Sequence, residues 1–146
     1  MPHEAGKAPI FLRRIPNWFL LQLVRSGWQF AVSGLEHLPR EGPLIVAGNH
    51  VDLIDGPLLA MAASSVRYMH FLGKAELFSI PILGWYLKRA GAIALDRHHG
   101  GVAAMRAAID VLRRGGCLGL FPEGTRSKTG LPGRPKGGIG FLAGQS

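Results

Sequence analysis

A strand–helix–strand pattern between residues 91 and 121 constrains the fold most strongly. Two apolar runs, GAIAL at 91–95 and CLGLF at 117–121, have the length and bounding residues of buried strands. The segment between them predicts a helix whose apolar residues share one face: Val102, Met105, Ile109 and Leu112. A strand, a helix and a strand at this spacing form a βαβ unit, so we expect a sheet that is at least partly parallel.

Two earlier apolar runs predict further strands, at 43–48 (PLIVAG) and 66–72 (VRYMHFL). Asp55 opens the next apolar run with a capping acid followed closely by a proline, which places it at or near a helix N-cap. A last helix is expected to begin near Lys136. We therefore expect an α/β fold, with a mostly parallel central sheet flanked by helices and an N-terminal amphipathic helix.

Each predicted strand is followed directly by polar residues. These are Asn49-His50 after the first, Gly73-Lys74 after the second, Asp96-Arg97 after the third, and Pro122-Glu123-Gly124-Thr125-Arg126 after the fourth. In open α/β sheets, ligands bind at the carboxyl ends of the strands. If the strands are parallel, the four groups meet at one edge of the sheet and form a site.

His50 and Asp55 are the candidate catalytic pair. A carboxylate has about four acceptor positions, so Asp55 can cap a helix and still hold the imidazole of His50, which leaves the other ring nitrogen free as a general base. Asp52 is a rival orienting group, and the structural alternative is that Asp55 only caps and His50 only lies in a loop. No Ser or Cys stands in a nucleophile-elbow sequence, so the base is expected to activate a hydroxyl of the substrate itself.

The chain is basic, with 17 Lys and Arg residues against 9 Asp and Glu residues and a formal charge of +8. Such an excess favours an anionic partner: phospholipid headgroups, a phosphorylated substrate or nucleic acid. We predict no nucleic-acid partner, because the sequence has neither an RNP-type aromatic motif nor a zinc-finger spacing. Arg97, Arg126 and Lys74 are expected to hold an anionic group of the substrate, and the alternative is that they are solvated surface charges.

The chain is the size of one domain, at 146 residues, with three predicted parts. Residues 1–9 are expected to form a polar, disordered start, residues 10–32 a membrane-interface helix, and residues 33–146 the main domain. Only ten residues between Arg14 and Arg25 are free of charge, whereas a transmembrane helix needs about 20 mostly apolar residues. Tryptophans and arginines in 10–32 are typical of a helix lying in the bilayer interface, and the alternative is an amphipathic helix packed on its own domain.

Three blocks of the sequence resemble those of the glycerolipid acyltransferases of the 1-acylglycerol-3-phosphate acyltransferase type. NHVDLID resembles the NHxxxxD block, GAIALDR the second block and FPEGTRS the third, in the same order. The stretch GKAELFSIPILGWYLKRAG, which joins the first block to the second, is also similar to the family. The resemblance runs from about Gly42 to the end of the chain.

The resemblance implies transfer of a fatty acyl group from acyl-CoA or acyl-carrier protein to the free hydroxyl of a phosphorylated lysolipid. His50 would be the base and Asp55 its orienting partner. The residues that fall where the family binds the acceptor are Arg97, Glu123, Gly124 and Arg126, with Lys74 as a weaker match. No metal and no cofactor are expected, and the protein would lie peripherally on an anionic membrane surface at its cytoplasmic face.

The sequence departs from the family pattern in two places. Asp52 stands where the family commonly has Ser or another small polar residue. The chain stops at Ser146 within a predicted helix, and the family's fourth block, which is associated with acyl-donor binding, does not follow. We therefore expect a C-terminally incomplete acyltransferase domain, with a non-catalytic lipid- or anion-binding remnant of such an enzyme as the alternative.

Overall fold

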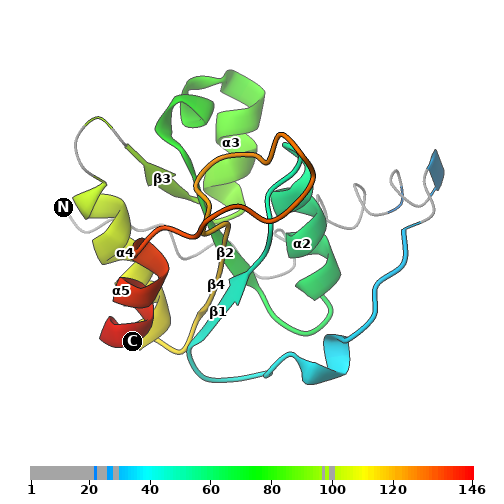
Figure 1. Cartoon of the computed structure of the whole chain (residues 1–146), viewed down its shortest axis with the longest axis horizontal. Coiled ribbons are helices and arrows are strands. Elements are labelled where there is room, and N and C mark those ends of the chain that lie inside the picture. The colour runs from blue at the N-terminus through cyan, green and yellow to red at the C-terminus, as the bar shows by residue number, and fades with distance from the viewer. Residues whose placement is uncertain (1–21, 23–25, 28–29, 97, 99–100) are drawn as a thin grey trace.

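The centre of the fold is a parallel sheet of four strands (Figure 1). The computed structural model describes residues 22, 26–27, 30–96, 98 and 101–146. The strands are β1 (Leu44–Ala47), β2 (Met69–Lys74), β3 (Ile93–Leu95) and β4 (Cys117–Leu120). They lie in the order β1-β4-β2-β3, and all three pairings are parallel. The parallel sheet expected from the sequence is therefore confirmed.

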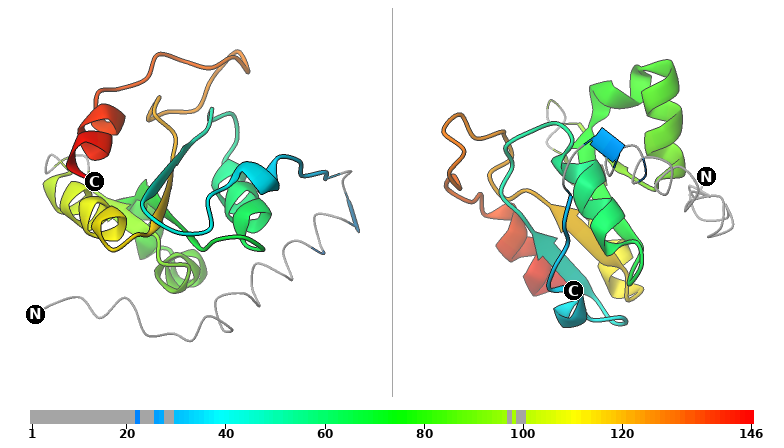
Figure 2. Two further views of the ribbon diagram at one scale, coloured as in Figure 1. Left: turned by 90° about the horizontal axis from the view of Figure 1, so that it is seen from below. Right: turned by 90° about the vertical axis from the view of Figure 1, so that its right-hand side faces the viewer.

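Helices cover both faces of the sheet, as the left-hand view of Figure 2 shows. The helices are α2 (Asp55–Ala63), α3 (Pro81–Arg89), α4 (Val102–Arg113) and α5 (Gly138–Gln145), with short 3-10 turns η1 (Leu35–His37) and η2 (Ala75–Ser79). Leu118 belongs to a core shared with α4 and α5, whereas its neighbour Cys117 packs with Ala63 of α2. Because successive strand residues point to opposite faces, β4 supplies both cores, and all four of its residues are buried.

The second strand differs from its predicted bounds. It begins at Met69 rather than at residue 66, because the backbone N–H groups of Val66 and Arg67 both bond the Ala63 carbonyl, at 2.9 and 2.8 Å, and prolong the turn after α2. It ends at Lys74, so Lys74 is the last strand residue and does not follow the strand.

Helix α3 was not among the predicted elements. Proline at its first position is favourable, because the missing N–H would have had no partner inside the helix. Gly84 lets α3 approach η2 closely, since an added Cβ atom would collide with the backbone of Phe78. The close packing of this helix therefore depends on a glycine, which apolar periodicity does not show.

The predicted membrane-interface helix at 10–32 lies almost wholly outside the described residues. Its structure and its role at a membrane therefore stay predictions. Among the described residues, no helix is both long and apolar enough to cross a bilayer.

Arg67 ties together the amino ends of three strands. Its buried guanidinium donates hydrogen bonds to the carbonyls of Pro39 (3.1 Å), Gly42 (2.8 Å) and Gly115 (2.6 Å). Pro39 and Gly42 precede β1, Gly115 precedes β4, and Arg67 itself precedes β2. One side chain thus satisfies three backbone acceptors and fixes where these strands start.

Replacing Arg67 with Met should lower the free energy of unfolding by about 2–4 kcal/mol, because three carbonyls lose their donor in a buried place. Thermal or urea denaturation followed by circular dichroism measures the loss. Arg40→Met, which removes an exposed arginine nearby, is the matched control. Equal stability of the two variants would contradict the role given to Arg67.

Candidate active site

His50 lies in the loop after β1, with its side chain 20% exposed. Its Nδ1 atom is 3.0 Å from Oδ2 of Asp55. An ionised carboxylate can only accept a hydrogen bond, so Nδ1 carries the proton and Nε2 is the nitrogen with the free lone pair. The arrangement is that of an oriented imidazole able to take a proton from a hydroxyl.

Asp55 holds the loop in front of its helix and does not cap the helix. It is the first residue of α2, whose N-cap is Ile54 and lacks a side-chain hydrogen bond. Oδ2 of Asp55 accepts the backbone N–H groups of Val51 (2.6 Å) and Asp52 (2.7 Å) in addition to the His50 ring. The expected position next to the helix N-cap is confirmed, but the carboxylate bonds the loop in front of the helix and closes residues 50–55 into a tight turn.

The pKa of the Asp55 carboxyl lies below its ordinary value of 3.8. Burial is the largest single influence and raises this pKa, but the N–H of Asp52, the His50 ring and the N–H of Val51 together lower it by more. Asp55 is therefore held as a carboxylate, the form that orients the imidazole.

Asp52, the rival orienting group, points to its own backbone. Its Oδ1 atom accepts the N–H of Ile54 at 3.2 Å in an exposed turn. Within the described part of the chain, Asp55 is the hydrogen-bond partner of the His50 ring and Asp52 is not. The geometry therefore favours Asp55 as the residue that orients the base.

Phe121 covers one face of the His50 ring. The two ring centroids are 4.2 Å apart with an interplanar angle of 12°, and Phe71 lies behind Phe121 at 6.3 Å. Phe121 follows directly after β4, so the sequence signal was its place at the same sheet edge as His50. In the sequence, Phe121 ends the predicted strand and begins the FPEGTRS block, and neither pattern indicates a contact with His50.

The loop after β4 is joined to the loop after β1. The backbone N–H of Ser127 donates to the His50 carbonyl at 2.6 Å. Beside this bond lies an open hollow of about 350 Å³, lined by Val51, Thr125, Arg126, Ser127 and Lys128. The structure therefore brings Arg126 close to the His50 loop, as expected, and adds a second cation, Lys128, that the three motifs did not single out.

Glu123 and Gly124 lie beneath the loop that follows them. Glu123 is buried, and an added Cβ on Gly133 would lie 3.4 Å from its carboxylate. Gly124 has a left-handed φ of 66°, and the Lys136 side chain packs over it. In this structure Glu123 lies against its own loop. The acceptor contacts expected of Glu123 and Gly124 stay predictions.

Lys74 and Arg97 were the other expected acceptor contacts. Lys74 is exposed at the end of β2, where it pairs with Leu95, and it does not line the hollow beside Arg126. Arg97 lies outside the described residues, so its part in acceptor binding stays a prediction.

Cys117 lies in the core of the sheet and does not have the exposure expected of a nucleophile. It is fully buried against Ala63 and Met69, and burial raises the pKa of its thiol, while the nearby Arg67 acts in the opposite direction. A neutral buried thiol is a packing residue. In the described ranges, no group of three or more His, Cys, Asp or Glu side chains is placed to hold a metal ion.

Comparison with known proteins decides the family. The sequence profile described as "Acyltransferase" matches residues 29–146. The chain belongs to the acyltransferase family. Similar curated proteins include the chloroplastic 1-acyl-sn-glycerol-3-phosphate acyltransferase LPAT1 of Arabidopsis thaliana, 32% identical over 80% of this chain and 33% of that protein. The Bacillus subtilis 1-acyl-sn-glycerol-3-phosphate acyltransferase is 30% identical over 66% of this chain and 48% of that protein.

A further relative and a solved structure extend the comparison. The lyso-ornithine lipid O-acyltransferase of Pseudomonas aeruginosa is 34% identical over 77% of this chain and 42% of that protein. The crystal structure of the 1-acyl-sn-glycerophosphate acyltransferase PlsC from Thermotoga maritima matches with a TM-score of 0.68 and 27% identity, over 96% of this chain and 57% of that one. This acyltransferase chain thus spans less than half of these curated relatives and just over half of the solved structure.

The lowered pKa of Asp55 predicts a specific loss of stability in acid. Because the folded-state pKa of Asp55 lies below its unfolded value, the ionised carboxylate stabilises the fold above about pH 3.8. This stabilisation is lost as the pH falls through the lower, folded-state pKa. Between about pH 5 and pH 3, the free energy of unfolding should therefore fall more steeply in the wild type than in Asp55→Asn. Urea denaturation at several pH values measures both slopes, and equal slopes would refute the assignment.

Proposed function

We propose that this chain transfers a fatty acyl group from a thioester, acyl-CoA or acyl-carrier protein, to the free hydroxyl of a phosphorylated lysolipid such as 1-acylglycerol-3-phosphate. The observation that carries the proposal is the His50–Asp55 pair, 3.0 Å apart, next to a hollow lined by Arg126 and Lys128. A base and an anion-binding surface are the two parts that this reaction requires.

The proposed reaction uses the free Nε2 of His50. This nitrogen takes the proton of the acceptor hydroxyl as the hydroxyl oxygen attacks the thioester carbonyl. The tetrahedral intermediate then collapses, the carbon–sulfur bond breaks, and the leaving thiolate recovers the proton from the imidazolium. Asp55 stabilises the imidazolium through Nδ1, and stacking on Phe121 keeps the ring in one plane.

The basic hollow bears on the choice of acceptor. Arg126 can engage a phosphate through two parallel hydrogen bonds, and Lys128 adds a second positive charge. Two of the relatives are named for 1-acylglycerol-3-phosphate and one for lyso-ornithine lipid. The cationic lining favours the phosphorylated acceptor, and we place the reaction at an anionic membrane surface, on its cytoplasmic face.

Thiol release from acyl-CoA or acyl-carrier protein, measured with and without lysophosphatidic acid, tests the proposal. Release that depends on the acceptor is the expected result. Calorimetric binding of lysophosphatidic acid without release would favour a non-catalytic lipid-binding protein, and the absence of both would refute the proposal. Lyso-ornithine lipid in place of lysophosphatidic acid separates an acceptor phosphate from a general lysolipid hydroxyl.

His50→Ala should lower turnover roughly 10²–10⁴-fold, the usual contribution of a general base, while the circular dichroism spectrum stays unchanged. Asp55→Asn should also be severe, because it removes the charge that orients the ring. Asp52→Ser is the matched control, since its side chain bonds only its own turn, and it should be mild. If Asp52→Ser were the damaging change and Asp55→Asn the mild one, the orienting group would have to be reassigned.

Arg126→Ala and Lys128→Ala should raise the KM for lysophosphatidic acid far more than the KM for the acyl donor. Loss of one charge-assisted contact corresponds to roughly a tenfold or larger change. Arg126→Lys should recover only part of the loss, because lysine cannot form the paired contact. Unchanged acceptor kinetics in the alanine variants would identify both residues as solvated surface charges.

A further inference from the structure

Helix α3 presents an apolar face to the outside of the molecule. Ile82 is 84% exposed and Trp85 is 56% exposed, and the Arg89 guanidinium lies 5.1 Å from the centre of the Trp85 ring. Positions 82, 85 and 89 lie three and four residues apart and therefore share one side of the helix. A large aromatic, a branched aliphatic and a cation are thus gathered on one outward stripe.

The packing of α3 prevents it from turning this stripe inward. Gly84 is buried on the opposite side, where the helix meets the Phe78 backbone too closely for any side chain. The N–H of Gly84 also bonds the Ile80 carbonyl at the start of the helix, at 2.6 Å. The exposure of Ile82 and Trp85 is therefore imposed by the fold.

The charges around this stripe are positive. Helix α3 contains no acidic residue, and Lys88 and Arg89 occupy its last turn. The acidic residue in the preceding turn, Glu76, lies 4.0 Å from the His98 ring. An apolar stripe with an aromatic residue and flanking cations complements an anionic lipid surface, in which the ring lies at headgroup depth and the cations lie on phosphates.

The stripe of α3 is not alone in exposing apolar side chains, because the loops after β1 and β4 do so as well. Those loops carry further exposed apolar side chains, including Leu53 beside His50 and Leu131 beyond Arg126. Exposed apolar residues thus recur along the edge that carries the base.

We propose that Ile82 and Trp85 on the outward stripe of α3, together with the cations Lys88 and Arg89 of its last turn, dock the protein on an anionic bilayer. This docking does not rest on the proposed function. The contact is separate from residues 10–32 and is made by a folded helix of the main domain.

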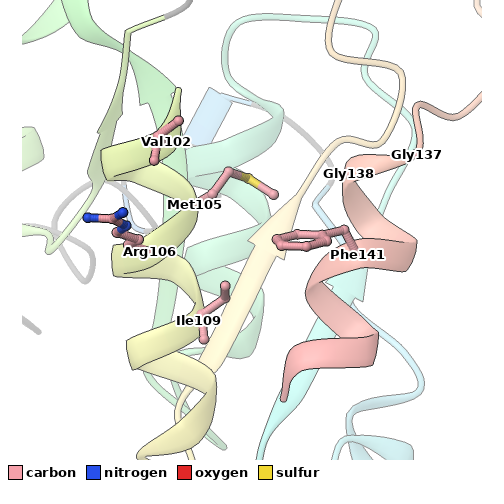
Figure 3. A pocket seen from close by; sticks show the side chains of 7 residues that line it. All are labelled: Val102, Met105, Arg106, Ile109, Gly137, Gly138 and Phe141. Carbon is pink, nitrogen blue, oxygen red and sulfur yellow. The ribbon is translucent and has the colours of Figure 1, made fainter. Parts of the chain in front are cut away.

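A second exposed apolar region provides a control for the α3 stripe. A hollow of about 370 Å³ lies between α4 and α5, where Met105 and Phe141 point toward each other (Figure 3). At its margin, Val102 is 56% exposed, which equals the exposure of Trp85. This hollow offers an equally exposed apolar residue away from the stripe.

Tryptophan fluorescence tests the docking directly. The chain has three tryptophans, so Trp18→Phe with Trp28→Phe leaves Trp85 as the single reporter. Vesicles of phosphatidylcholine and phosphatidylglycerol in equal amounts, with brominated acyl chains, should quench Trp85 and shift its emission to the blue. Quenching should weaken as salt screens the cations. Emission that brominated vesicles leave unchanged would overturn the proposal.

Vesicle co-sedimentation of the full chain supplies the second measurement. Ile82→Ser with Trp85→Ser should lower vesicle affinity by roughly tenfold or more, since burial of side chains of this size is worth at least that factor. Val102→Ser should leave affinity unchanged, and thermal melts verify that both variants are folded. An equal loss in both variants, or no loss in either, would overturn the proposal. So would a change in oligomer size on size-exclusion chromatography with unchanged vesicle affinity, because the stripe would then contact a second copy.

The two proposals fail separately. Quenching and co-sedimentation require no turnover, so docking without acceptor-dependent thiol release would remove the proposed function and leave the docking surface. Thiol release from a short-chain, water-soluble lysophosphatidate, together with unquenched Trp85, would do the reverse. If both proposals hold, Ile82→Ser with Trp85→Ser should lower turnover of vesicle-embedded acceptor and spare the soluble one.

Discussion

The parallel pairing of β4 with β1 on one side and β2 on the other is the constraint on which the site depends. Ala47 is in register with Leu120, so the loops after β1 and β4 leave the sheet level with each other. His50 and Phe121 therefore meet as stacked rings, and the Ser127 N–H reaches the His50 carbonyl. Residues more than seventy positions apart become neighbours because two strands share a direction and a register. Arg67 fixes the same strands at their opposite ends.

The sequence predicts the strands well because the relevant signal is local. A central parallel strand is covered on both faces and reads as a continuous apolar run, as β4 does. Polar residues at the end of each run then indicate the edge where ligands bind. The His50–Asp55 pairing is local as well, but the further hydrogen bonds of Asp55 could not be predicted from the sequence. An acid before Gly-Pro predicts a helix cap, and only the turn of residues 50–55 directs its oxygen backward to Val51 and Asp52.

The elements that the sequence did not predict depend on long-range packing. Helix α3 has only nine residues, and apolar side chains occur on both its outward and its inward side, so its pattern does not single out the face that packs inward. One of its close contacts is through Gly84, which has no side chain to signal it. Glu123 is a similar case: a glutamate after a strand reads as exposed, but the return of the loop through Gly133 buries it. The burial of such residues depends on which distant segment packs against them, and the spacing of residues along the chain does not indicate this.

The open hollow beside His50 and the exposed apolar side chains of the neighbouring loops have one physical explanation. A general base acts best where water is excluded, because water competes for the proton and screens the Asp55 charge. The hollow next to His50 is open to solvent, so the described residues do not by themselves exclude water from it. A bilayer against this edge would cover the hollow and would deliver an acceptor whose headgroup already lies at the interface. On this argument, the exposed Leu53 and Leu131 of the neighbouring loops, which are unfavourable in water, would contact the lipid that completes the site.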